Sequence, residues 1–79
     1  MLPQSMLALA ELPELNSAQI AFIQTDDPTR IRLLGMGLGK GSCVEVLRNR
    51  KGDLVLSSGN NRISLGKSIT QHIFVQIAA

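Results

Sequence analysis

The chain has 79 residues, one cysteine, one histidine and a formal net charge of +2, which together exclude several classes of protein. Cys43 alone cannot form an intramolecular disulfide, and with His72 it cannot build a multi-cysteine or paired-histidine metal site. Only 3% of the residues are aromatic, which argues against a site that stacks nucleic-acid bases. No apolar run approaches the ~20 residues that span a bilayer, and no signal peptide is recognisable. We therefore expect a soluble cytoplasmic protein without direct membrane insertion.

Residues 1–79 are predicted to form a single domain that begins with a loose N-terminus over residues 1–5. The run from Leu7 to Leu12 predicts a short edge strand. Residues 18–23 predict a second strand, in which Ile20 and Phe22 share one face.

A short helix is predicted from about Pro28 to Met36. Asp27 can accept the first hydrogen bond of this helix, and Pro28 suits the first helical position, so capping explains the Asp26–Asp27 pair better than metal binding does. Arg30 and Arg32 are expected to point outward. The buried stripe is expected to contain apolar residues at helical spacing, namely Ile31, Leu34 and either Leu33 or Met36.

Glycines stand at positions 35, 37, 39 and 41, directly after this helix, with Lys40 among them. A phosphate-binding loop of the Walker type lies between a strand and a following helix, whereas here the helix comes first. We interpret the segment as a helix end followed by a tight turn that needs positive φ, with Gly37 closing the helix.

Four more strands follow in chain order. Residues 42–48 predict a strand with Val44 and Val46 inward, Glu45 outward and Cys43 as a small buried side chain. Residues 54–56, 62–65 and 73–77 predict the others, and residues 59–61 predict a hairpin turn. A one-turn helix is expected near Ser68, whose hydroxyl is a candidate cap.

These elements predict a mainly β fold, a small SH3-like or OB-like β-barrel of five to six short strands with one short α-helix. Closing such a sheet into a barrel would remove its exposed edges. Edge strands of two copies can pair with each other. The sequence therefore does not fix the oligomeric state, and a homo-oligomer is one of the alternatives.

No residue pattern supports catalysis, so we expect that the protein is not an enzyme and binds no cofactor. The side chains able to bind a metal are scattered along the chain, and no metal site is expected among them: His72, Asp26, Asp27 and Glu45. The turn that carries Arg48, Arg50 and Lys51 is either a solvated loop or a docking point for an acidic partner or phosphate.

The segment Arg32–Leu47 reads RLLGMGLGKGSCVEVL and resembles, without a gap, the signature of the ferrous iron transport protein A (FeoA) family, R-L-x-x-[LM]-G-[IL]-x-x-G-[ST]-x-V-x-V. Leu15 and Asn16 stand where that family usually has a glycine. The residues that carry the resemblance are Leu33, Met36, Gly37, Leu38, Gly41, Ser42, Val44 and Val46.

This resemblance implies an SH3-like domain that acts without catalysis, through contact with the cytosolic part of the ferrous iron transporter FeoB. We expect the contact to use basic side chains of the helix and of the turn, namely Arg30, Arg32, Arg48, Arg50 and Lys51. Two alternatives stay open. A basic barrel could bind nucleic acid, although the low net charge and the few aromatic residues argue against this partner. A metal-responsive module could bind a divalent ion.

Overall fold

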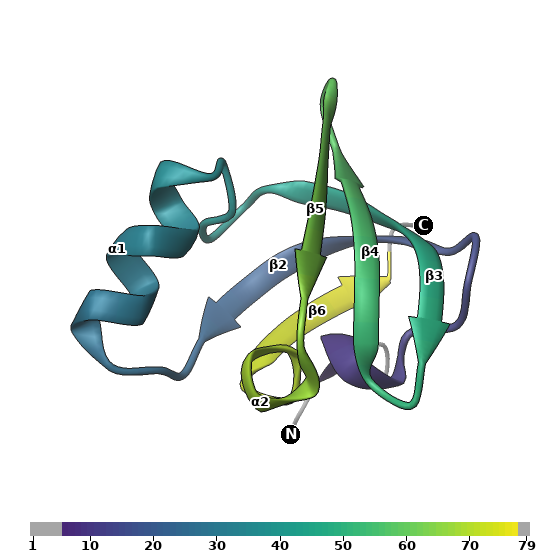
Figure 1. Ribbon diagram of the computed structural model, residues 1–79, viewed down its shortest axis with the longest axis horizontal. Coiled ribbons are helices and arrows are strands. Elements are labelled where there is room, and N and C mark those ends of the chain that lie inside the picture. The colour runs from purple at the N-terminus through teal and green to yellow at the C-terminus, as the bar shows by residue number, and fades with distance from the viewer. Residues whose placement is uncertain (1–5, 78–79) are drawn as a thin grey trace.

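The computed structural model describes residues 6–77, which form a strongly bent antiparallel sheet with short helical elements around it (Figure 1). The strands are β1 (Met6–Ala8), β2 (Ser17–Ile23), β3 (Cys43–Arg50), β4 (Asp53–Ser58), β5 (Asn61–Leu65) and β6 (Ile73–Ile77). The helical elements are the 3₁₀ helix η1 (Leu9–Glu11) and the α-helices α1 (Asp27–Gly35) and α2 (Lys67–Thr70). None of the helices within residues 6–77 has the length and apolar character needed to cross a membrane.

The strands pair in the order β1-β6-β2-β3-β4-β5, which confirms the predicted mainly β, SH3-like fold. The sheet is open, however: within residues 6–77, no pairing joins β1 to β5. Instead, α2 packs against β4 and η1, and these two short helices cover one end of the sheet (Figure 1). β5 therefore keeps one free edge, contrary to the expectation of a closed barrel.

The core is almost entirely aliphatic, because the strands alternate side chains between the inner and outer faces of the bent sheet. Val44 and Val46 are buried as predicted, whereas Cys43 is exposed, not buried, because it precedes Val44 by one residue and points to the opposite face. The buried apolar residues are Leu9, Leu12, Ala18, Ile20, Leu33, Leu38, Val44, Val46, Leu54, Leu56, Ile63, Leu65, Ile73 and Val75.

Two strands near the N-terminus differ from the prediction. The first strand ends at Ala8, because the chain turns into η1 at Leu9. In β2, the pairing with β6 shifts register between Ile20 and Phe22, so these two side chains do not share a face. Ile20 is buried, whereas Phe22 is 42% exposed and stacks on Phe74 with ring centroids 4.7 Å apart.

Two tight hairpins shape the second half of the sheet. Lys51 and Gly52, both with positive φ, connect the paired residues Arg50 and Asp53, as in a type I′ turn. Residues 59–60 connect the paired residues Ser58 and Asn61, with positive φ at Gly59, as in a type II′ turn, which confirms the hairpin predicted there.

The predicted one-turn helix is α2, but Ser68 does not cap it. The N-cap residue is Gly66, and the Asp53 carboxylate accepts a 2.8 Å hydrogen bond from the backbone N–H of Lys67. The cap therefore comes from a distant strand, which the local sequence around α2 does not indicate.

Leu15 has an unusual backbone conformation in the loop before β2. Its φ of 68° lies in the left-handed region, where leucine is unfavourable and glycine is not. The resemblance to the FeoA signature places a glycine near this position, and here a leucine adopts the conformation that glycine adopts without strain.

Candidate protein-docking face around α1

α1 begins with a side-chain cap one residue earlier than predicted. The Asp26 carboxylate, and not that of Asp27, accepts a 3.2 Å hydrogen bond from the backbone N–H of Thr29. Asp27 instead forms a 3.3 Å ion pair with Arg30, and both side chains are more than half exposed, so this pair adds little stability. The cap fixes where α1 starts and therefore which residues lie on its outer surface.

The cap makes α1 sensitive to acid. Hydrogen bonding by Thr29, through its side chain first and its backbone N–H second, lowers the pKa of Asp26 below its ordinary value. A lowered folded-state pKa gives stability that is present above the unfolded pKa of about 3.9 and lost as pH falls through the folded pKa. We expect Asp26→Asn, which caps without titrating, to remove this part of the acid sensitivity.

Thermal midpoints of the wild type and of Asp26→Asn, measured between neutral pH and pH 2, test this expectation. Asp26→Ala is the control, because it loses the cap at every pH. An acid dependence of Asp26→Asn equal to that of the wild type would contradict it.

The segment after α1 connects the helix to the sheet through a dense set of backbone bonds. Gly37 has a φ of 86°, as predicted for the residue that closes the helix, and Leu38 N–H then donates to the Leu33 carbonyl at 2.8 Å. The Ser42 hydroxyl accepts from Gly39 N–H at 3.0 Å and donates to the Gly37 carbonyl at 3.1 Å. The FeoA-like motif thus forms a structural turn between α1 and β3.

The same motif ties this turn to β2. Gly41, with a φ of 91°, donates its N–H to the Ile20 carbonyl at 2.8 Å, and Ile20 N–H donates to the Ser42 carbonyl at 2.8 Å. Because Leu33 and Leu38 are buried on either side of the turn, they hold α1 at the side of the molecule. Figure 1 shows α1 standing apart from the sheet.

α1 buries only one of its apolar side chains, which corrects the predicted stripe. Leu33 is 1% exposed, but Ile31 and Leu34 are 68% and 64% exposed, and Met36, just after the helix, is 37% exposed. The reason is geometric: a helix that stands off the sheet buries a single residue, and the rest of its surface faces solvent. Arg30 and Arg32 are exposed as predicted.

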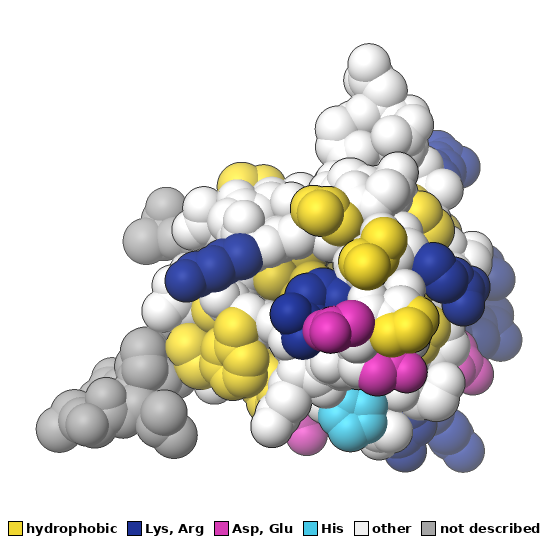
Figure 2. Space-filling view, turned by 90° about the vertical axis from the view of Figure 1, so that its left-hand side faces the viewer, with side chains coloured by type: hydrophobic (Ala, Val, Ile, Leu, Met, Phe, Trp, Pro, Cys, Tyr) yellow, Lys and Arg dark blue, Asp and Glu magenta, His cyan; other side chains and the backbone are white. Residues whose placement is uncertain are grey.

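The exposed side chain of Leu34 on α1 borders a groove of about 340 Å³. Phe22 and Leu34 line it together with the buried Leu38, and the cationic side chains Arg30 and Lys40 stand beside them. Figure 2 looks at the molecule from the α1 side and shows hydrophobic side chains in several groups, with basic and acidic side chains between them. We call the set Phe22, Ile31, Leu34 and Met36 the apolar face.

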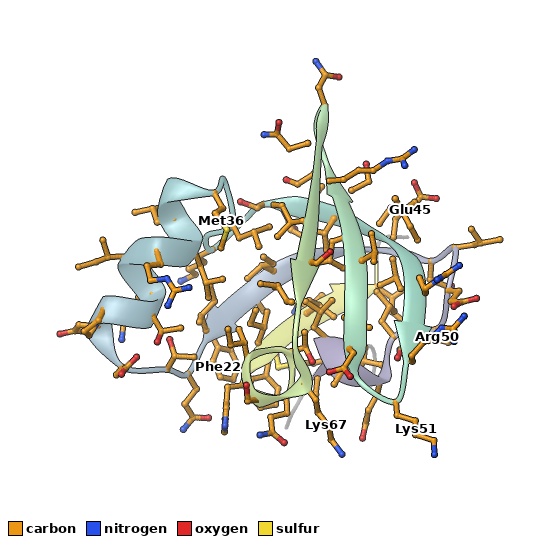
Figure 3. The ribbon with its side chains drawn as sticks, in the orientation of Figure 1. Phe22, Met36, Glu45, Arg50, Lys51 and Lys67 are labelled. Carbon is orange, nitrogen blue, oxygen red and sulfur yellow. The ribbon has the colours of Figure 1, made fainter. Side chains whose placement is uncertain are left out.

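The basic turn is not part of this face. Figure 3 shows Arg50 and Lys51 on the side of the molecule opposite α1. Arg48, Arg50 and Lys51 are all exposed, and they form no ion pair within the described residues. The five basic residues expected to make one contact therefore divide into two clusters, Arg30 with Arg32 on α1 and the other three at the β3–β4 turn.

The candidate metal ligands do not converge. Within the part of the chain that the structure describes, no group of three or more His, Cys, Asp or Glu side chains could hold an ion. His72 and Asp26 line one polar pocket together with threonine and serine hydroxyls, but Glu45 lies on β3 at the far side (Figure 3).

Two features of the structure, one in the site and one outside it, went unrecognised in the sequence. The first is the exposure of Ile31 and Leu34. The signal for it was present, because apolar residues at positions 31, 33, 34 and 36 occupy more than one face of a helix, and a short helix cannot bury them all. The second is Asn49. Its amide group donates to the carbonyls of Ala10 and Leu12 at 3.0 and 2.9 Å, and its side-chain oxygen accepts from Gly52 N–H at 3.0 Å.

The fold and the glycine-containing turn define the class of this protein. The family model described as the FeoA domain matches residues 7–77, and the chain belongs to the FeoA family. The Fe(2+) transport protein A of Methanocaldococcus jannaschii is 34% identical over 47 residues, which cover 60% of this chain and 57% of that protein. The chain thus matches little more than half the length of this relative.

Solved structures agree with this assignment. The solution structure of the FeoA protein from Chlorobium tepidum has a TM-score of 0.84 and 25% identity, covering 92% of this chain and 71% of that one. A manganese-dependent transcriptional repressor has a TM-score of 0.83 and 22% identity, covering 99% of this chain and 45% of that one. The similarity to the repressor shows a shared fold.

Proposed function

We propose that this protein is a non-catalytic accessory protein of ferrous iron uptake, which acts in the cytoplasm by docking on the ferrous iron transporter FeoB. Membership of the FeoA family and the name of the Methanocaldococcus jannaschii relative support the link to iron transport. A motif used to build a turn, in a chain without a recognised catalytic pattern, supports a role in binding.

The observation that carries the proposal is the exposure of Ile31 and Leu34. Two aliphatic side chains that are about two-thirds exposed on one short helix, beside a groove, form the kind of patch that marks a protein interface. Arg30, Arg32 and Lys40 around them supply a polar rim, which is the usual arrangement of an interface with an apolar centre. The apolar face thus replaces the basic turn as our expected contact, and Arg30 and Arg32 remain in it.

A calorimetric titration tests this proposal. Full-length FeoB in detergent and its isolated cytosolic GTPase domain are each titrated with the wild type, with Leu34→Asp and with Arg50→Glu. We expect Leu34→Asp to weaken binding at least about tenfold, because it places a charge in the centre of the contact. Arg50→Glu, on the opposite side, should change the affinity by less than about twofold.

The outcomes separate the alternatives. If Arg50→Glu abolishes binding and Leu34→Asp does not, the basic turn is the contact and the apolar face is not. If neither FeoB preparation binds the wild type, the proposed function is wrong. The thermal midpoint of Leu34→Asp serves as the folding control, and it should stay near the wild-type value because the side chain is 64% exposed.

A further inference from the structure

The free edge of β5 presents unpaired backbone groups. The two-residue turn makes Ser58 and Asn61 a hydrogen-bonded pair, and such pairs alternate along an antiparallel ladder. Ile63 and Leu65 therefore bond to β4, whereas the N–H and C=O groups of Arg62 and Ser64 point away from it. Within residues 6–77, β5 pairs with no second strand.

A narrow groove separates this edge from α1. It has a volume of about 140 Å³ and is lined by Ser64 and Leu65 from β5 and by Arg32, Leu33 and Met36 from the α1 side. Figure 3 shows Met36 between α1 and β5. Toward the hairpin tip, β5 rises above the rest of the molecule (Figure 1).

We propose that an extended segment of a protein partner adds to β5 as a seventh strand, in the groove between β5 and α1. The segment would bond to the backbone of Arg62 and Ser64. Its alternate side chains would be apolar toward Leu65 and Met36, because strand residues alternate between faces, and polar toward solvent.

The position of α1 argues for a lone segment and against a second copy of this chain. An added strand lies about 4.8 Å from β5, and a further strand behind it would lie another ~4.8 Å away. Side chains of α1 line the same groove as Ser64 and Leu65, so α1 occupies the space that the second strand of another sheet would need. An unpaired extended segment has no such second strand.

Charge argues for an acidic segment. Arg62 is exposed on the outer face of β5, and Arg32 stands at the rim of the groove. Neither guanidinium forms an ion pair with a carboxylate of residues 6–77. An acidic side chain opposite Arg62 in the added strand would complete a cross-strand pair of opposite charge.

This inference does not rest on the proposed function. The two surfaces meet at α1 and share Met36 and Arg32, but Leu34 belongs only to the first of them and the backbone of β5 only to the second. Leu34 borders the groove that contains Phe22, whereas Met36 and Arg32 border the groove beside β5. Leu34→Asp should therefore weaken docking on FeoB and leave strand addition intact.

The test is an NMR titration of the full chain with the peptide Thr-Val-Glu-Val-Thr-Val-Glu-Val-Thr, capped at both ends. We expect saturable shifts at β5 and Met36, and at saturation at least about tenfold slower hydrogen exchange at the amides of Arg62 and Ser64, because these amides become bonded. The same peptide with every backbone amide N-methylated should not slow their exchange, since it has no N–H donor on either edge.

Two variants sharpen the test. Ser64→Pro removes an N–H that makes no bond to β4, which an edge strand tolerates, and it should abolish binding. Arg62→Glu should weaken binding of the glutamate peptide and favour the peptide with lysine in place of glutamate. The second comparison holds even if Ser64→Pro unfolds the chain.

Three results would overturn the proposal: no saturable shift with millimolar peptide, shifts without slower exchange at Arg62 and Ser64, or equal binding of the N-methylated peptide.

Discussion

Replacing Leu33 by alanine is expected to lower the free energy of unfolding by about 3 kcal/mol, because it removes a fully buried side chain and leaves a cavity. Leu33 is 1% exposed and is the buried residue of α1. Urea denaturation of the variant and the wild type measures the change. Leu34→Ala is the matched control: it removes the same atoms from a neighbouring position that is 64% exposed, and it should cost less than about 0.5 kcal/mol.

The same substitution should also loosen α1 itself. An isolated helix of nine residues is not stable in water, so α1 depends on its packing against the core. We expect faster amide exchange in α1 of Leu33→Ala than in the strands. If Leu34→Ala were as costly as Leu33→Ala, Leu34 would be packed, and the apolar face would not be free to bind a partner.

Replacing Asn49 by alanine is expected to lower the free energy of unfolding by about 2–3 kcal/mol. Asn49 joins three segments through its side chain: it bonds to the carbonyls of Ala10 and Leu12 in and after η1, and to Gly52 N–H in the β3–β4 turn. Alanine leaves these partly buried groups without their partners. Denaturant unfolding of the variant measures the loss.

Asn49→Asp separates the two kinds of bond. An aspartate oxygen can still accept from Gly52 N–H, but the carboxylate cannot donate to the carbonyls of Ala10 and Leu12 and repels them. We expect this variant to be at least as unstable as Asn49→Ala at neutral pH and to regain stability when the carboxyl group is protonated. Wild-type stability at neutral pH would show that the two donated bonds contribute nothing.

Features set by neighbouring residues were predictable from the sequence. The Gly37 turn follows from a glycine directly after a capped helix, and the inward direction of Val44 and Val46 follows from strand alternation. The hairpin at residues 59–61 follows from a glycine and asparagines between two apolar runs. In each case the signal lies within a few residues of the structure that it specifies.

Features set by distant contacts were not predictable. The apolar spacing of α1 indicates that some of its apolar residues stay exposed. Which of them do so depends on how α1 stands against the sheet, and nothing within the helix encodes that placement. The shift between Ile20 and Phe22 arises from pairing with β6, more than 50 residues later in the chain. Asn49 looked like part of a polar turn, yet its partners lie 37 and 39 residues away.

The basic residues show the same limit. Arg32 and Arg48 are both exposed cations, but the sequence does not reveal that one lies in the cluster on α1 and the other in the cluster at the β3–β4 hairpin. For this reason the predicted partner site combined side chains that the fold places in two clusters. The exposure of these cations could be predicted from the sequence, whereas their grouping required the fold.

The position of α1 beside β5 has a consequence for solubility. Helices held by few buried side chains open more readily than the sheet to which they attach, so α1 is the element that local unfolding should release first. Once α1 moves away, β5 presents an unguarded edge on which the sheet of another molecule can pair, and edge pairing of this kind starts aggregation. Concentrated solutions should therefore begin to aggregate under conditions in which most of the sheet is still folded. The packing of one leucine, Leu33, would then determine the shelf life of the protein as well as its stability.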